Sequence, residues 1–218
     1  DDATFANYLP GNNASLVSHL TGQLTEDGEP FLYLWGGSGV GCSHLLQAAC
    51  HNADAQGKRA LYLPLATLGH FPPDILEEPE RLDLLAIDDL QLVVGRKRWE
   101  EALFHGFNRL RDAGKRLVIA ADRSPRQLEI KLPDLASRLS WGMVFHAQPL
   151  DDTQRLAALQ LRAQVRGMEL PPEVGRYILH RGPRQLDPLF DILARLDSAS
   201  LSAKRRLTIP FVKQALEW

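Results

Sequence analysis

The sequence predicts an α/β domain built on a five-stranded parallel sheet, followed by a small all-helical domain. Over the first two thirds of the chain, short apolar runs alternate with segments of helical periodicity. After Leu150 the strand signal ends and only helical segments follow. The composition, 44% hydrophobic and 24% charged over 218 residues, is that of a globular protein with one large or two modest domains. We therefore expect domains at 1–149 and 150–218.

Five short runs are the expected strands, and each is apolar throughout, as is typical of a parallel strand covered on both faces. They are Phe31–Trp35, Ala60–Leu63, Leu84–Ile87, Leu117–Ala121 and Met143–Phe145. Between the third and fourth runs, four large apolar residues recur at helical spacing before Gly114, and we interpret them as the face of a helix that packs on the sheet. They are Trp99, Leu103, Phe107 and Leu110.

Four helices are expected after the sheet. They cover Asp151–Val165, a segment from Pro171 or Pro172 to His180, Arg184–Ala199, and Phe211–Glu217 after Pro210. Asp151 or Asp152 caps the first helix, and Gly167 lies beyond its end. Pro188 is compatible with the third helix only in its first turn.

Charge and cysteine content exclude several classes of protein. A net charge of −2 provides no global field that would hold a polyanion, so any DNA contact is local or made through a partner. The short basic clusters 96–98 and 204–206 favour solvated surface over a DNA footprint. Cys42 and Cys50 are the only cysteines, which indicates a reducing, cytoplasmic compartment. The apolar runs are too short for a membrane helix, and the seven histidines lack metal-ligand spacing.

The first strand leads into a glycine-rich segment, 36–44, and then into a helix. The segment follows the phosphate-loop pattern of Gly, four residues, Gly, Lys, and Ser or Thr, except that Cys42 takes the place of Lys. Such glycines let successive backbone N–H groups point at a phosphate chain at the positive end of a helix. A merely tight strand–helix connection is the alternative. The candidate nucleotide-binding residues are Gly37, Ser38, Gly39, Val40, Gly41, Cys42, Ser43 and His44.

Cys42 changes the expected chemistry of this loop. The missing ammonium normally reaches the β- and γ-phosphates and neutralises charge as the terminal phosphoryl group leaves. A thiol cannot do this, so we expect diphosphate binding to survive and triphosphate hydrolysis to be slow. A reactive Cys42 nucleophile is the rival interpretation, because a helix N-terminus lowers the pKa of a thiol.

Acidic residues follow the third and fourth strands. Asp88 is expected to support Mg²⁺ together with the Ser43 hydroxyl, and Asp89 to polarise the attacking water. Asp122 would lie between these acids and the phosphates as a γ-phosphate sensor. Helix caps or turns are the alternatives for all three acids. Arg138, if near a subunit edge, would reach a neighbour's phosphate; its alternative is a surface salt bridge.

Four motifs in order resemble the AAA+ core of the bacterial DnaA family, and most closely its shorter, Hda-type regulators. They are Gly36–Ala48, Ile87–Gln91, Ala121–Leu128 and Leu135–Gly142, within a resemblance that extends from Phe5 to Lys213. DnaA itself carries a further helix-turn-helix domain, for which a chain ending at Trp218 leaves no room. This favours the Hda type.

The resemblance implies an AAA+ domain with a helical lid, whose nucleotide-loaded form is carried by the replicative sliding clamp. It docks on ATP-bound DnaA, stimulates hydrolysis there and inhibits replication initiation. Arg138 matches the arginine finger, Asp122 the sensor, and Asp88 and Asp89 the acidic pair. The segment that packs on base and ribose is matched by Tyr8, Pro10, Asn12 and Asn13. The clamp-binding peptide is expected upstream of Asp1.

Two departures from the family pattern change the expected ligand. Cys42 replaces the loop lysine, and Asp187 stands where the lid's second sensor arginine belongs. Arg184 either replaces that arginine in part, from the same helix face, or is a solvated helix charge. We therefore expect a nucleoside diphosphate, most readily ADP, with Mg²⁺, if any, at Ser43 and Asp88.

Two other functions are compatible with the sequence. One is a self-contained AAA+ ATPase, such as a DnaA-like remodeller or a helicase loader. The other is a phosphate-loop scaffold kept only for protein interaction. Self-association is compatible with the resemblance, because AAA+ neighbours meet with one subunit's finger at the next subunit's nucleotide.

Overall fold

The computed structural model describes residues 2–203 and 205–218, and the chain divides into two compact units. The first unit contains the residues up to Phe5 and Asn12–Gln148. The second contains Ala6–Gly11 and Pro149–Trp218. Residues 6–11, which precede the first strand in sequence, therefore cluster with the helical unit. The units are described separately below.

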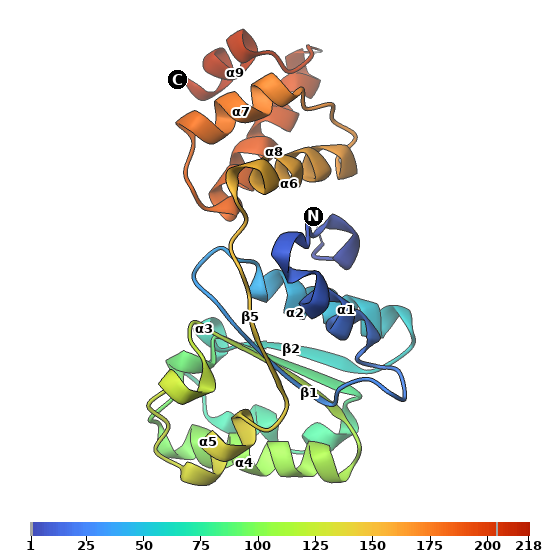
Figure 1. The fold of residues 1–218 in the computed structure, drawn as a ribbon, viewed down its shortest axis with the longest axis vertical. Helices are drawn as coiled ribbons and strands as arrows, with labels where there is room; N and C mark the ends of the chain where they lie inside the picture. Colours follow the sequence, from blue (N-terminus) through green and yellow to red (C-terminus); the bar gives the residue numbers. More distant parts are fainter. Residues whose placement is uncertain (1, 204) are drawn as a thin grey trace. The chain divides into compact units, whose positions relative to one another are not determined.

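The first unit is built on a parallel sheet, as the sequence predicts (Figure 1). Its strands are β1 (Phe31–Trp35), β2 (Ala60–Pro64), β3 (Leu84–Asp88), β4 (Arg116–Ala121) and β5 (Met143–His146). They are ordered β2-β3-β4-β1-β5, and each neighbouring pair is parallel. The fold class is confirmed, and the strand ends differ from the expected ones by at most one residue.

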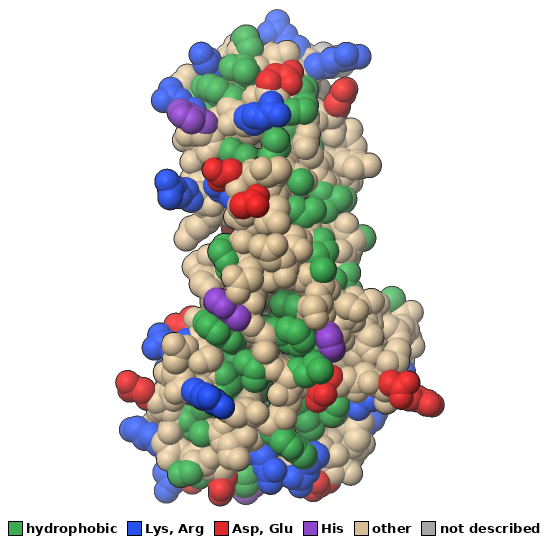
Figure 2. All heavy atoms as spheres, in the orientation of Figure 1, with side chains coloured by type: hydrophobic (Ala, Val, Ile, Leu, Met, Phe, Trp, Pro, Cys, Tyr) green, Lys and Arg blue, Asp and Glu red, His purple; other side chains and the backbone are tan. Residues whose placement is uncertain are grey.

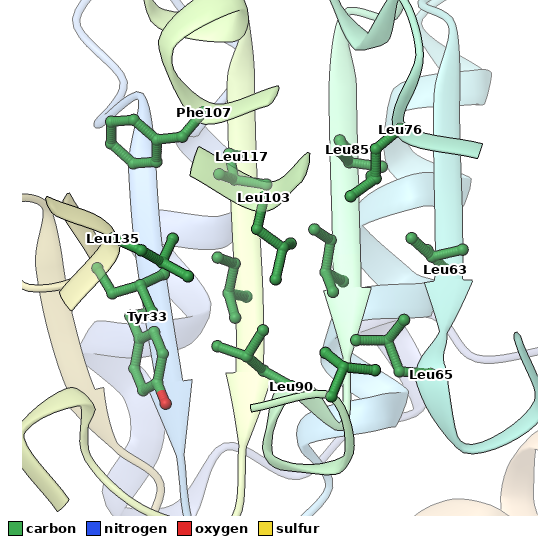
Figure 3. Packing of buried hydrophobic residues seen from close by; sticks show 14 of the residues in the cluster. Tyr33, Leu63, Leu65, Leu76, Leu85, Leu90, Leu103, Phe107, Leu117 and Leu135 are labelled. Atoms are coloured by element: carbon green, nitrogen blue, oxygen red, sulfur yellow. The ribbon is translucent and has the colours of Figure 1, made fainter. Parts of the chain in front are cut away.

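Helices cover both faces of this sheet (Figure 1). On one face lie α1 (Ala14–Gly22) and α2 (Cys42–Ala55), and on the other α4 (Lys97–Asp112) and α5 (Pro133–Leu139). The apolar stripe predicted on α4 is buried in the core between this helix and the sheet, where Figure 3 shows Leu103 and Phe107 near Leu117 and Leu85. The interpretation of that stripe as core packing is confirmed.

The expectation that every strand is covered on both faces is wrong for β5. Met143 and Val144 are each exposed by about two fifths. The strand pairs only with β1 and therefore forms an edge of the sheet. An edge strand can be as apolar as a central one in sequence, because apolar composition does not report how many neighbours a strand has.

The connections of the first unit contain short helical turns. They are α3 (Leu65–Leu68) and the 3₁₀ turns Pro73–Leu76, Pro79–Arg81, Leu90–Leu92 and Pro125–Gln127. Two further 3₁₀ turns, Phe5–Asn7 and Gly11–Asn13, lie near the N-terminus.

The second unit is a helical bundle with its own apolar core. Its helices are α6 (Asp152–Val165), α7 (Pro172–Arg181), α8 (Leu186–Ala203) and α9 (Ile209–Leu216). Asp151 is the cap of α6, since its side chain accepts the Gln154 N–H at 2.8 Å. Helix α8 begins two residues later than expected, so Arg184 lies before it. The argument that Arg184 and Asp187 share a helix face is therefore wrong.

No helix in the described ranges is both long and apolar enough to cross a membrane.

Candidate nucleotide site

The carboxyl ends of β1, β3 and β4 meet at one edge of the sheet. Trp35, the last residue of β1, is in register with Ala121 of β4, and β4 lies beside β3. The Gly36 N–H continues the ladder by donating to the Ala121 carbonyl at 3.3 Å. The segments that follow these three strands therefore leave the sheet side by side, which is where parallel α/β sheets place ligands.

The phosphate loop has the backbone that its glycines predict. Gly39 and Gly41 have φ angles of +79° and +91°, a region that other residues adopt only with strain. Gly41 is also the N-cap of α2, and no side chain caps its first turn. The first amides of α2 are thus left to other acceptors, which is the arrangement that holds a phosphate at a helix N-terminus.

Cys42, the first residue of α2, is a neutral group at physiological pH. Burial, followed by the nearby charges of Asp88 and Asp89, raises the pKa of its thiol to about 12. Burial and these carboxylates together outweigh the effect of the helix N-terminus, which alone would lower the pKa of the thiol. The environment therefore opposes the interpretation of Cys42 as a reactive nucleophile.

Asp88 ends β3 and is only 3% exposed. Its Oδ2 accepts the Tyr62 hydroxyl at 2.7 Å, and its Oδ1 accepts the Asp89 N–H at 2.9 Å. The side chains of Gln47 and Ser43 lie close enough to the Tyr62 hydroxyl to lower its pKa in part. Burial and the bond to Asp88 raise the pKa of Tyr62, so its hydroxyl keeps the proton that it shares with this carboxylate.

Gln91 joins the other two acids of the site. Its amide donates to Asp89 Oδ1 at 3.0 Å, and its Oε1 accepts the Asp122 N–H at 3.2 Å. The Asp122 carboxylate faces outward, where both of its oxygens accept from the Arg123 guanidinium at 2.8 and 2.7 Å. This hydrogen-bonded ion pair lowers the pKa of Asp122. Hydrogen bonds thus connect Asp88, Asp89 and Asp122, although Asp122 takes part through its backbone N–H and not through its carboxylate.

The N-terminal part of the first unit is tied to the same region. His44, within the predicted phosphate loop, contacts the Thr4 carbonyl at 2.9 Å. Asn13, which follows Asn12, is buried. Its side-chain N–H donates to the Gln148 carbonyl at 2.9 Å, and its Oδ1 accepts the Gln148 N–H at 2.7 Å. The Asn13 side chain therefore joins the start of α1 to the segment after β5.

Three predicted nucleotide contacts belong to the second unit. Tyr8 and Pro10 lie in the segment Ala6–Gly11, and Asp187 lies in the first turn of α8. Asp187 lies near Arg162 of α6. Burial lowers the pKa of Arg162, and the negative charge of Asp187 raises it in part. Asp187 thus has a cationic neighbour within its own unit. Its role toward a nucleotide stays a prediction, as do those of Tyr8 and Pro10.

Arg138 lies near the end of α5, beside aromatic residues at the start of β1. Its guanidinium carbon is 5.5 Å from the centre of the Trp141 ring, which in turn stacks on Phe31. Phe31 is the first residue of β1, whereas the phosphate loop follows the last residue of this strand. Phe31 and the loop are therefore separated by the length of the strand, about 13 Å.

The predicted basic clusters are on the surface. In 96–98, Arg96 donates to the Gly69 carbonyl at 2.7 Å, Lys97 pairs with Glu101 at 3.8 Å, and Arg98 with Asp74 at 3.7 Å. Local partners of this kind are those of a solvated face. In the second cluster, Arg205 and Arg206 are exposed, and Lys204 lies outside the described residues.

Tyr62 and Gln91 are site residues that sequence reasoning missed. Gln91 belongs to a recognised motif, but its spacing does not indicate that one amide would link acids from two strands. Tyr62 was read only as part of an apolar strand, although the strand pairs Pro64 with Asp88 and so places Tyr62 near the end of β3. A hydroxyl within an otherwise apolar strand was the available signal.

Ser43 and Asp88 provide oxygens suited to Mg²⁺, and the Tyr62 hydroxyl, which donates to Asp88, lies near both residues. The described residues contain no group of three or more His, Cys, Asp or Glu side chains that could hold a metal ion. The residues fit a Mg²⁺ ion whose remaining ligands come from phosphate and water, and they do not form a metal site of their own.

Two protein-family models match separate parts of the chain. Residues 73–146 match the bacterial DnaA ATPase domain, and residues 152–216 match the Hda lid domain. The first match contains the acidic pair and Arg138, and the second spans the helical unit.

Solved structures agree with these matches. Domain III of the Thermotoga maritima replication initiation protein DnaA is 26% identical, with 99% of this chain and 96% of that chain covered and a TM-score of 0.81. AMPPCP-bound DnaA from Aquifex aeolicus is also 26% identical, with 88% of this chain and 64% of that chain covered and a TM-score of 0.74. A RuvB variant from Thermotoga maritima shares the fold. It is 15% identical, with 96% of this chain and 67% of that chain covered and a TM-score of 0.68.

Proposed function

The chain belongs to the Hda family of DnaA-related AAA+ proteins, and from that premise we propose that it is a nucleotide-loaded regulator of DnaA. In this proposal it stimulates ATP hydrolysis by DnaA through Arg138 and so inhibits the initiation of DNA replication. Its own hydrolysis is weak or absent. The protein acts in the cytoplasm.

One observation carries the proposal: the nucleotide loop and Arg138 lie at opposite ends of β1. An arginine there cannot serve the nucleotide bound by its own loop. It is half-buried, and its guanidinium makes no ion pair with any described residue. Such a group is suited to reach the γ-phosphate of a neighbouring protein, where it stabilises charge that develops in the transition state.

The loop in turn favours a diphosphate. Main-chain amides of the loop and of the first turn of α2 would hold the α- and β-phosphates. Cys42 supplies no cation for a γ-phosphate, because a thiol is neutral when protonated and negative when ionised. Asp187, in place of a sensor arginine, adds none either. Ser43 and Asp88 would hold a Mg²⁺ that accompanies the nucleotide, and this ion would neutralise phosphate charge.

The proposed partners are proteins. DnaA receives Arg138, the replicative sliding clamp carries the regulator, and DNA is contacted only indirectly. Figure 2 shows acidic and basic side chains interspersed on the face drawn, in keeping with the net charge of −2. If two copies of this chain associate in the manner of AAA+ neighbours, Arg138 of one copy would contact the nucleotide of the other.

The test is single-turnover hydrolysis of ATP that is already bound to DnaA, in the presence of DNA-loaded sliding clamp. A full-length chain with ADP bound is expected to accelerate it, and Arg138→Ala to lose the acceleration while retaining ADP. Because an arginine finger contributes about 10³- to 10⁵-fold, the loss is expected to be nearly complete. Arg98→Ala, which removes an exposed arginine of the same unit, is the matched control.

Unchanged acceleration by the Arg138→Ala protein would exclude the proposed mechanism. Steady-state turnover of ATP by the isolated chain distinguishes the proposed regulator from the main alternative, a self-contained ATPase. Robust hydrolysis without DnaA would instead favour a self-contained ATPase.

A further inference from the structure

Three aromatic rings form a platform at the start of β1, which we define as Phe31, Phe107 and Trp141. The Phe31 and Phe107 rings stack, with centroids 4.3 Å apart and planes at 23°. Trp141 lies 6.0 Å from Phe31, also at 23°, and 6.1 Å from Phe107. Phe31 and Phe107 are buried in the core on which α4 packs, where Figure 3 shows Phe107. The outer ring is thus fixed by two inner ones.

The backbone around Trp141 is equally constrained. Its N–H donates to the Arg138 carbonyl at 3.0 Å and so closes the end of α5. The next residue, Gly142, packs so closely on the Phe31 backbone that any Cβ would collide with the Phe31 carbonyl. The indole therefore has little freedom to move, although 56% of Trp141 is exposed.

Arg138 uses this fixed ring as its support. Its guanidinium carbon is 5.5 Å from the indole centroid, within the range of a cation–π contact. An arginine side chain has many rotamers, and ordering one costs free energy at the moment when it meets a phosphate. A ring that already holds the guanidinium lowers that cost, because less freedom remains to be lost.

From this geometry we infer that Trp141 is a positioning residue for the catalysis proposed above: its π face holds Arg138 in the orientation that the ATP site of the partner requires. The inference rests on the proposed function. Trp141 acts through Arg138, so its loss lowers the maximal rate of stimulated hydrolysis and leaves the affinity for the partner unchanged.

The test uses substitutions that separate the π face from apolar bulk. Trp141→Leu keeps an apolar contact with Phe31 and loses the π face, whereas Trp141→Phe keeps both in part. For each ADP-loaded protein, the rate of hydrolysis of DnaA-bound ATP is measured against protein concentration. This gives a maximal rate and a half-saturating concentration. Phe71→Leu, which removes another exposed aromatic ring of the same unit, is the control.

Trp141→Leu is expected to lower the maximal rate roughly two- to fivefold, the size of a cation–π contact, at an unchanged half-saturating concentration. Trp141→Phe and the control are expected to match the natural chain. A leucine variant with the natural maximal rate, or one that changes only the half-saturating concentration, overturns the inference. If the leucine variant does not retain ADP, Trp141→Met is held to the same criteria.

Failure of the inference differs from failure of the proposed function. If Arg138→Ala abolishes stimulation and Trp141→Leu does not lower it, only the role of Trp141 is excluded. If Arg138→Ala still stimulates, the proposed function itself fails.

Discussion

At the scale of single residues, Cys42 determines which phosphates the site can neutralise. The loop around it has the backbone of a nucleotide-binding loop, with left-handed glycines on either side of Val40. The side chain at its end is a protonated thiol beside two carboxylates. We therefore expect main-chain binding of phosphate to be kept while the cation that would face a γ-phosphate is missing.

The first prediction reverses this substitution. Cys42→Lys places an ammonium between Asp88, Asp89 and the phosphates, and a hydrogen bond to a charged group contributes about 1.5–3 kcal/mol. The affinity for a non-hydrolysable ATP analogue is expected to rise relative to that for ADP by about tenfold or more. Calorimetric titration of both nucleotides measures this, with Cys42→Ala as the control. An unchanged ratio would show that the loop lysine is not the missing determinant.

The second prediction concerns Tyr62. Its hydroxyl donates to a carboxylate that is almost fully buried, so Tyr62→Phe leaves one oxygen of Asp88 without this partner. We expect a loss of about 1–3 kcal/mol in the free energy of unfolding, measured by denaturant titration. Tyr177→Phe is the matched control, because the buried Tyr177 hydroxyl lacks a hydrogen-bond partner in the described part of the chain. Equal losses in the two variants would argue against a specific role for the Tyr62–Asp88 bond.

At the scale of elements, a buried carboxylate holds the segment that leads to α5. Glu100 of α4 is 2% exposed, and its side chain accepts backbone N–H groups of Gly95, Lys131 and Leu132 at distances between 2.7 and 3.1 Å. These bonds connect the loop before α4 with the loop before α5, the helix that carries Arg138. The position of Arg138 thus depends on a contact distant from it in sequence.

The third prediction concerns the hydrogen bonds that Glu100 accepts. Glu100→Ala leaves three backbone N–H groups without their buried acceptor, and the expected cost is about 3–5 kcal/mol of the free energy of unfolding. Glu101→Ala is the control next to it: its exposed pair with Lys97, at 3.8 Å, contributes at most about 0.5 kcal/mol. Chemical denaturation of both variants decides the matter. A Glu100 variant as stable as the control would contradict the role assigned to this carboxylate.

The elements that sequence could predict are those with a local signature. Strands were located because each is a short apolar run, and α4 because Trp99 and its neighbours repeat at helical spacing. Helix α1 and helix α5 were not predicted, and their lengths of nine and seven residues leave little periodicity to detect. The exposure of β5 depends on strand order, which no local pattern contains.

The candidate site divides in the same way. Its loop was predicted because contiguous residues form it. The links made by Tyr62 and Gln91 join separate strands, so only the folded sheet brings them together. Likewise, spacing cannot indicate that Trp141 stacks on Phe31, since more than a hundred residues separate the two in sequence.

At the scale of the whole molecule, the chain combines an α/β unit that carries both the nucleotide loop and Arg138 with a helical unit of the Hda lid type. Within the first unit, β1 connects the two functional ends. Its carboxyl end opens into the loop, and its amino end contributes Phe31 to the platform under Arg138. A single strand thus separates the loop proposed to bind nucleotide from the arginine proposed to act on another protein.

The central claim is that the loop holds a diphosphate through main-chain amides and lacks the cations that a triphosphate needs. The most direct measurement incubates the nucleotide-free protein with equal millimolar ADP and ATP, removes free nucleotide and quantifies by chromatography what remains bound. ADP is expected to predominate, with one equivalent retained at most. Preferential retention of ATP, or no retention of either nucleotide, would contradict it.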